Sequence, residues 1–313
     1  MTAVLRRELL IGLRRGAPYA LLATNAILLA GLAAAVGALA GTVSPWTAPA
    51  IGATTAATPT GLWPTLVAWR GPTLFVLLTA WLAVMATAIA PTIGTRALTY
   101  ERRAGTLDDL IASGVGPLAI VFGKLVVVSI QTGLVLLSAA PAFALVWLFG
   151  GVGARVVLLA AFFLGAYVLF LAALGLLAGA VAGGDLLPAA LGSLVAALLL
   201  VATLAGFATL VVAGRSGGPM LAAANPLIAL LVANGEFAEA LGKVLPAAFA
   251  VPVRPTIEVL GRSLGGPLPL VAGLGYLALG LALLPLAAAA LDPYHPIKTL
   301  GLRRASSPPG AEC

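Results

Sequence analysis

The segment 96–125 gathers charged side chains of both signs between two long apolar stretches. Its charged residues are Arg96, Glu101, Arg102, Arg103, Asp108, Asp109 and Lys124. Thr106 can cap a short helix that begins at Leu107 and carries two aspartates in its first turn, near the positive end of the helix dipole. Leu107, Leu110 and Ile111 give this helix an apolar side at helical spacing. These side chains could pair with a complementary protein surface, so the segment is either a docking element or an ordinary hydrophilic loop.

Residues for ATP hydrolysis, metal binding or nucleophilic catalysis do not occur in the patterns that such chemistry requires. The Gly-Lys pair at Gly123 and Lys124 has Leu118 where the first glycine of a phosphate-binding loop would stand. One histidine, His295, and one cysteine, Cys313, cannot complete a metal shell. Three serines of the apolar stretches are expected to bond to backbone carbonyls: Ser129, Ser138 and Ser193. We therefore expect no enzyme activity, and neither a metal nor a cofactor bound by this chain.

The composition is that of an integral membrane protein. Of the 313 residues, 61% are hydrophobic and 9% are charged, and the mean hydropathy is +1.12. Soluble domains carry about 25% charged residues, so an ordinary water-soluble enzyme and a disordered chain are both excluded. The formal net charge is +7. The basic residues are scattered between apolar blocks without forming a stripe, so they indicate positively charged cytoplasmic loops and not a nucleic-acid partner.

Uncharged stretches long enough to cross a bilayer predict an all-α membrane protein with six transmembrane helices. A crossing needs about 20 apolar residues, because ionised side chains are costly in hydrocarbon. The predicted spans are 19–40, 73–95, 121–149, 156–182, 187–213 and 270–291. Together they form a single transmembrane domain over 1–304, followed by a cytoplasmic tail at 305–313.

Two long segments are expected outside the membrane. Segment 41–72 carries four prolines between residues 42 and 64, among threonines and small residues, which suits an outer loop better than a lipid-facing helix. In the second outer loop, 214–269, a short apolar part at 221–233 is interpreted as re-entrant or interfacial. The same loop contains an amphipathic stretch at 236–245, which is either a lid or a simple connector. At the N-terminus, residues 6–16 have leucines on one face and arginines on the other, which predicts an interfacial helix.

The distribution of Lys and Arg places both termini in the cytoplasm. With the N-terminus inside, the inner segments hold eleven of these residues and the outer segments hold six. Four of those six lie in the long loop 214–269, where charge has less influence on orientation. The spans themselves are expected to lack ionisable residues, with Lys124 at cytoplasmic depth.

Small residues and prolines predict how the helices pack. Gly175, Gly179 and Gly183 recur at four-residue spacing, a pattern that allows two helices to approach closely. We favour packing within the chain over dimerisation as its purpose. Pro141 lies inside the third span and is expected to kink it.

The residues around 101–124 resemble the segment between the second and third helices of ABC transporter permeases of the type-2 exporter class. The matching positions are Glu101, Arg102, Gly105, Thr106, Leu107, Asp108, Leu110, Gly123 and Lys124. Looser matches extend along the chain, at Pro91, Pro141, Gly150 and Asn225. Two positions depart from the family's pattern, which often has a second acidic residue where Arg103 stands and a proline where Gly114 stands.

In that family the matching segment forms a coupling helix that docks on a cytoplasmic ABC ATPase subunit. The resemblance therefore implies a coupling helix between the second and third spans. It implies that seven residues couple this chain to the ATPase: Glu101, Arg102, Gly105, Thr106, Leu107, Asp108 and Leu110. It also implies a second permease chain, identical or related, and ATP and Mg²⁺ bound by the ATPase subunit. The expected location is the inner (plasma) membrane of a bacterial cell.

The implied function is that of the membrane-spanning subunit of an ATP-driven exporter. Because the spans are uncharged, a hydrophobic or amphipathic substrate is expected. One alternative is a secondary transporter or channel, for which ionisable groups within spans or an inverted repeat would be typical. The other is a non-transporting membrane anchor that holds a cytoplasmic protein through the same segment.

Overall fold

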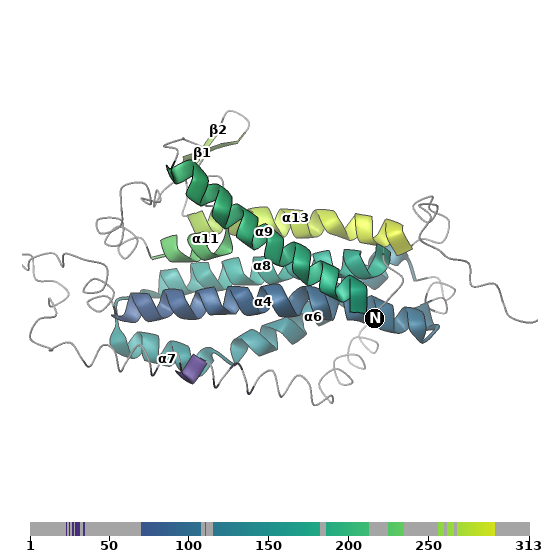
Figure 1. Cartoon of the computed structure of the whole chain (residues 1–313), viewed down its shortest axis with the longest axis horizontal. Helices are drawn as coiled ribbons and strands as arrows, with labels where there is room; N and C mark the ends of the chain where they lie inside the picture. Colours follow the sequence, from purple (N-terminus) through teal and green to yellow (C-terminus); the bar gives the residue numbers. More distant parts are fainter. Residues whose placement is uncertain are drawn as a thin grey trace, which may run out of the picture.

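The chain folds into a bundle of long apolar helices in the computed structural model (Figure 1). The structure describes residues 70–107, 110, 115–181, 186–212, 225–234, 256–259, 262–265 and 268–291, with isolated helical positions between 23 and 34. The expected interfacial helix 6–16, most of span 19–40, the stretch 236–245 and the tail 305–313 lie outside the described residues. So do residues 41–69 of the outer loop predicted at 41–72, whose last three residues belong to a helix that begins at Arg70. Asp108, Asp109, Ile111 and Gly183 also lie outside the described residues.

Four helices among the described residues are long and apolar enough to cross a membrane. They are α4 (Arg70–Arg103), α6 (Pro117–Leu137), α8 (Ala154–Val181) and α13 (Leu268–Leu291). A fifth helix, α9 (Leu186–Val212), has 27 residues, and its part at 192–206 is apolar. Helices satisfy their backbone groups internally, which is why apolar segments of this length adopt them where water is excluded. The described residues thus establish four candidate crossings, where the sequence predicts six.

Helix α8 lies at the centre of the bundle. It packs most extensively against α13 on one side and α4 on the other, and α9 crosses them obliquely (Figure 1). One apolar cluster joins the first halves of α4 and α8 around Phe75 and Phe163. A second cluster joins Leu98, Leu176 and Leu284, near the C-terminal ends of α4, α8 and α13. These three helices therefore run in the same direction and end at the same face of the bundle, which we call the Glu101 end.

Glycines bring α4 and α8 into close contact, as the four-residue spacing predicts. A Cβ atom added to Gly175 would lie 2.3 Å from the carbonyl oxygen of Pro91, and one added to Gly179 would lie 2.7 Å from that of Thr95. The Thr95 hydroxyl donates to the carbonyl oxygens of Pro91 at 2.9 Å and Gly175 at 3.0 Å. The preference for packing within the chain is confirmed at Gly175 and Gly179.

The predicted third span, 121–149, is two helices. Helix α6 ends at Leu137, and α7 (Ala140–Phe149) begins after a turn at residues 138–139. Pro141 lies in the first turn of α7, where its missing N–H has no cost, and its ring excludes a continuous helix through Leu137. The expected kink is therefore an interruption. Residues 121–149 therefore do not form one continuous helix.

The loop predicted at 214–269 contains two short ordered elements. Helix α11 (Pro226–Val232) has seven residues, too few to cross, and Asn225 caps it by accepting from the N–H groups of Leu227 and Ile228. Four of its residues and its proline are buried, so this segment packs within the bundle. Strands β1 (Thr256–Val259) and β2 (Arg262–Gly265) form an antiparallel hairpin. The all-α prediction missed this hairpin, although the protein is helical elsewhere in its described part.

Candidate functional site

The charged segment singled out by the sequence begins inside a helix. Helix α4 continues to Arg103, with Arg102 and Arg103 in its last turn, where cations oppose the negative end of the dipole. The N–H of Ala104 donates to the carbonyl of Tyr100 at 3.0 Å, and Gly105 follows with φ +71°. Glycine adopts this left-handed backbone conformation without steric cost and commonly ends helices. A turn at Gly105 therefore follows the end of α4.

Glu101 and Lys124 form an ion pair between α4 and α6. The Lys124 ammonium donates to the Glu101 Oε1, and the two side chains are only 9% and 11% exposed, Lys124 being the less exposed. Lys124 lies within α6, seven positions after its first residue, whereas the sequence places it at cytoplasmic depth beside the spans. Removing both charges from water is costly, and the attraction between the two charges offsets this cost only while they stay in contact. The pair therefore locks the end of α4 to α6.

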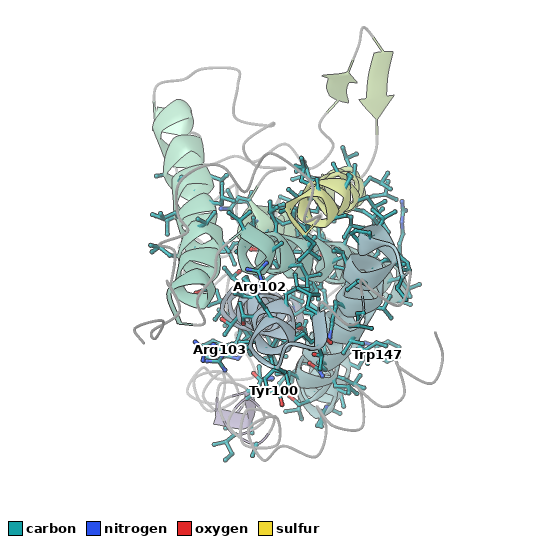
Figure 2. All side chains as sticks on the ribbon, turned by 90° about the vertical axis from the view of Figure 1, so that its right-hand side faces the viewer. Tyr100, Arg102, Arg103 and Trp147 are labelled. Atoms are coloured by element: carbon teal, nitrogen blue, oxygen red, sulfur yellow. The ribbon has the colours of Figure 1, made fainter. Side chains whose placement is uncertain are left out.

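Arg102 joins α4 to α8. Its Nη2 donates to the carbonyl oxygen of Ala180 at 2.9 Å, one residue before α8 ends at Val181. The last carbonyls of a helix have no partner within the helix, so the guanidinium satisfies one of them. In Figure 2, which looks onto the Glu101 end, Arg102 lies among the helices, whereas Tyr100 and Arg103 lie toward the edge of the bundle. Adjacent arginines thus have different surroundings.

An exposed turn remains beyond these contacts. Arg103, Ala104, Gly105 and Thr106 are exposed, and we call residues 103–106 the α4 turn. The hydroxyl of Thr106 donates to the carbonyl oxygen of Glu101 at 3.3 Å, which ties the turn back to the last turn of α4. The backbone is helical again from Thr106, one residue earlier than predicted. As a helix cap, Thr106 would accept a hydrogen bond from the backbone N–H of Asp108 or Asp109, and both residues lie outside the described part of the chain.

Leucines anchor the segment that follows. Leu107 is 5% exposed and belongs to the apolar cluster with Leu98 and Val121, and Leu110 packs against that cluster. The predicted apolar side of the segment is therefore real at these two positions. Four of the predicted site residues lie close together in the structure: Glu101, Arg102, Thr106 and Leu107. Glu101 and Leu107 are buried, Arg102 is partly buried and Thr106 is exposed.

Sequence reasoning missed the internal partners of Glu101 and Arg102. Lys124 matched the family pattern but was not assigned a role, although a lone cation inside a strongly apolar helix is itself a signal for a buried partner. The Ala180 carbonyl offers no such signal, since every helix end presents carbonyls. Of the three serines expected to bond to carbonyls, Ser138 does so, at 2.6 Å from the Val135 oxygen. The buried hydroxyl of Ser129 has no hydrogen-bond partner, so that prediction was wrong there.

A second polar cluster lies between helices away from the Glu101 end. The indole N–H of Trp81 donates to Asn25 Oδ1 at 2.9 Å, and Asn25 Nδ2 donates to Ser138 Oγ at 2.8 Å and to the Val135 carbonyl at 3.2 Å. Asn25 is 3% exposed. The cluster supplies polar partners at the turn between α6 and α7, where the helical ladder is interrupted.

The described residues contain no group of three or more His, Cys, Asp or Glu side chains that could hold a metal ion. The Glu101 end thus presents an exposed turn, and the two residues just before it contact α6 and α8. Neither a family profile nor a curated protein sequence matches the chain.

Proposed function

We propose that this chain is the membrane-spanning subunit of an ATP-driven exporter of the ABC type, with ATP and Mg²⁺ bound by a separate cytoplasmic ATPase. The observation that supports it is the α4 turn. Its four residues are exposed, and the residue pair just before it, Glu101 and Arg102, is tied to α6 and α8 by side-chain contacts. A loop that only connects two spans needs no such contacts. The family resemblance of residues 101–124 points to the same role.

In this proposal Glu101 positions the turn and does not touch the ATPase. Its carboxylate is buried against Lys124 of the same chain, so a docking contact belongs to exposed atoms of the α4 turn. The segment at Asp108 and Leu110 would complete the coupling helix. Its apolar side lies against the bundle through Leu107 and Leu110.

The packing of the bundle would let a movement of the α4 turn reach the neighbouring helices. Because the glycine contacts bring the backbones of α4 and α8 together, the two helices cannot slide past each other freely. ATP-driven closure of two ATPase subunits would push the α4 turn, and α4, α6 and α8 would tilt as one body. We propose six spans with both termini in the cytoplasm of a bacterial cell, and a second permease chain facing this one.

The length of α4 supports a turn outside the hydrocarbon layer. Its 34 residues extend about 51 Å at 1.5 Å per residue, whereas the hydrocarbon core is about 30 Å thick. The α4 turn can therefore stand in water while the middle of α4 crosses the membrane. The apolar surfaces of the spans suit a hydrophobic or amphipathic substrate.

Two tryptophan substitutions test the proposal. The tagged chain is purified from its own cells, and vanadate-sensitive ATP hydrolysis and the mass of the associated protein are measured. Ala104→Trp should abolish both, because the indole covers the docking surface of the α4 turn. Ala154→Trp is the matched control, since Ala154 is also exposed but begins α8 at the opposite end of the bundle. This control should keep both.

Four outcomes would overturn the proposal. The first is ATP hydrolysis by the chain after its partners have been stripped away with salt. The second is full retention of partner and hydrolysis in Ala104→Trp, which would make the α4 turn a connector. The third is substrate flux in vesicles driven by an ion gradient without ATP, which would place the protein among secondary transporters or channels. A partner that binds but hydrolyses no ATP would indicate an anchor instead.

A further inference from the structure

A groove runs between α8 and α13 at the end of the bundle opposite Glu101. Its volume is about 490 Å³, and its lining residues are Arg155, Leu158, Leu159, Phe162, Leu270 and Leu274. Five of the six are apolar. Leu158 and Leu274 are 70% and 52% exposed, so the groove is open along the side of the bundle. Both helices are candidate membrane crossings and lie side by side (Figure 1).

The position of Phe162 makes the groove a fixed feature of the helix pair. A Cβ atom added to Gly273 would lie 2.8 Å from the ring atom Cε1 of Phe162, so the absence of a side chain at Gly273 gives the ring its place against α13. The ring thereby forms a wall of the groove. In a bilayer, hydrocarbon must fill such a recess, since an empty apolar recess forfeits dispersion contacts along its whole lining.

Arg155 supplies charge at the mouth of this apolar recess. It is the second residue of α8, and its exposed side chain lies where α8 begins. Helix α13 begins at the same end of the bundle, because α8 and α13 share the cluster near their C-terminal ends. The positive ends of two helix dipoles therefore add to the charge of the guanidinium. A guanidinium binds phosphate oxygens through two parallel N–H donors, which an ammonium cannot do.

We propose that this groove binds one anionic phospholipid. The phosphate of the headgroup pairs with Arg155, and one acyl chain lies in the groove along Leu158 and Leu274. Charge complementarity selects the anionic headgroup, and the apolar lining selects a lipid over a soluble phosphate compound. The site is independent of the exporter proposal, because it needs only that α8 and α13 lie in a membrane.

The test is a lipid titration of the delipidated, full-length chain in a neutral detergent, followed by native mass spectrometry. Phosphatidylglycerol and phosphatidylcholine with identical acyl chains are compared. The wild-type chain should bind phosphatidylglycerol more tightly. Arg155→Gln should weaken that binding about fivefold, the factor expected for one arginine near a membrane surface. It should weaken phosphatidylcholine binding less, because the choline cation already offsets the phosphate charge of that lipid. Leu274→Trp should fill the groove and weaken the binding of both lipids.

Matched controls separate this site from general attraction to anionic lipid. Arg96→Gln removes an exposed arginine from α4, and Leu204→Trp adds an indole to the exposed face of α9. Neither should change lipid binding. Circular dichroism and gel filtration verify folding, and Leu158→Trp replaces Leu274→Trp if the latter does not fold. The proposal is wrong if Arg155→Gln keeps the wild-type preference or if Arg96→Gln loses it equally. Competition by glycerol 3-phosphate would also overturn it, because a headgroup alone would then suffice.

Discussion

Lys124 and Glu101 are 23 positions apart in the sequence, yet the ammonium of one donates to the carboxylate of the other in the interior of the bundle. This contact links the end of α4 to the second turn of α6. With the bond from Arg102 to the Ala180 carbonyl, it holds three helix ends together immediately below an exposed turn. The proposed coupling role depends on this arrangement.

Glu101→Gln should destabilise the protein strongly. The variant leaves the Lys124 ammonium buried without a counter-charge, and breaking a buried pair costs about 3–5 kcal/mol. The double variant Glu101→Gln/Lys124→Met should recover much of this loss, since no charge is then buried. Thermal unfolding of the purified chains measures both effects, and Arg96→Gln, at an exposed position, serves as the control. Equal melting temperatures for Glu101→Gln and wild type would contradict a stabilising pair.

Glu101→Arg tests positioning against direct docking. The reversal places a second cation against Lys124, so we expect the melting temperature to fall together with the ATPase association. If Glu101 touched the ATPase directly, the reversal would abolish association while leaving the melting temperature of the isolated chain unchanged. Measuring both quantities on one preparation distinguishes the two roles.

Gly175→Ala should separate α4 from α8. The added methyl would lie 2.3 Å from the Pro91 carbonyl oxygen, so backbone must move, at a cost of about 1–3 kcal/mol. Gly165→Ala is the matched control in the same helix, where a Cβ atom meets nothing within 4 Å. It should be neutral or slightly stabilising, because alanine favours a helix over glycine by up to about 1 kcal/mol. Equal unfolding temperatures for the two variants would refute a close contact at Gly175.

The hydrogen bond from Trp81 to Asn25 should stabilise the turn between α6 and α7. Trp81→Phe leaves Asn25 Oδ1 without its indole donor, and the loss should be about 1 kcal/mol, as for other hydrogen bonds between membrane helices. A double-mutant cycle with Asn25→Leu isolates this bond from the change in volume. Trp147→Phe, at a position 62% exposed, should have no effect. A coupling energy of zero would show that this hydrogen bond does not stabilise the protein.

Orientation is tested by labelling at the two ends of the bundle. In a Cys313→Ser background, an impermeant maleimide added to intact cells should label Ala154→Cys and spare Ala104→Cys. The two alanines lie at opposite ends of the bundle, so an odd number of crossings separates them. Labelling of both from outside would contradict the proposed orientation.

Much of the helical framework follows from the sequence alone. Ionised groups are expensive in hydrocarbon, so the charge-free stretches locate α4, α8 and α13 to within a few residues, apart from the extensions of α4 at both ends. The glycine spacing at Gly175 and Gly179 predicts close packing, because it depends on residue size within one helix. Each of these features is local, and local features follow from residue type and spacing.

Only the tertiary structure shows which side chains of different helices contact one another. In the sequence, Glu101 is one of several charged residues of both signs in a segment between two apolar stretches. Its burial against Lys124 depends on how α4 and α6 pack. The interruption at Pro141 required the same context, because Asn25 and Trp81 come from other helices to bond near the break. The groove beside Arg155 exists only because α8 and α13 are adjacent. Contacts between distant segments depend on the relative positions of helices, which periodicity within one helix does not encode.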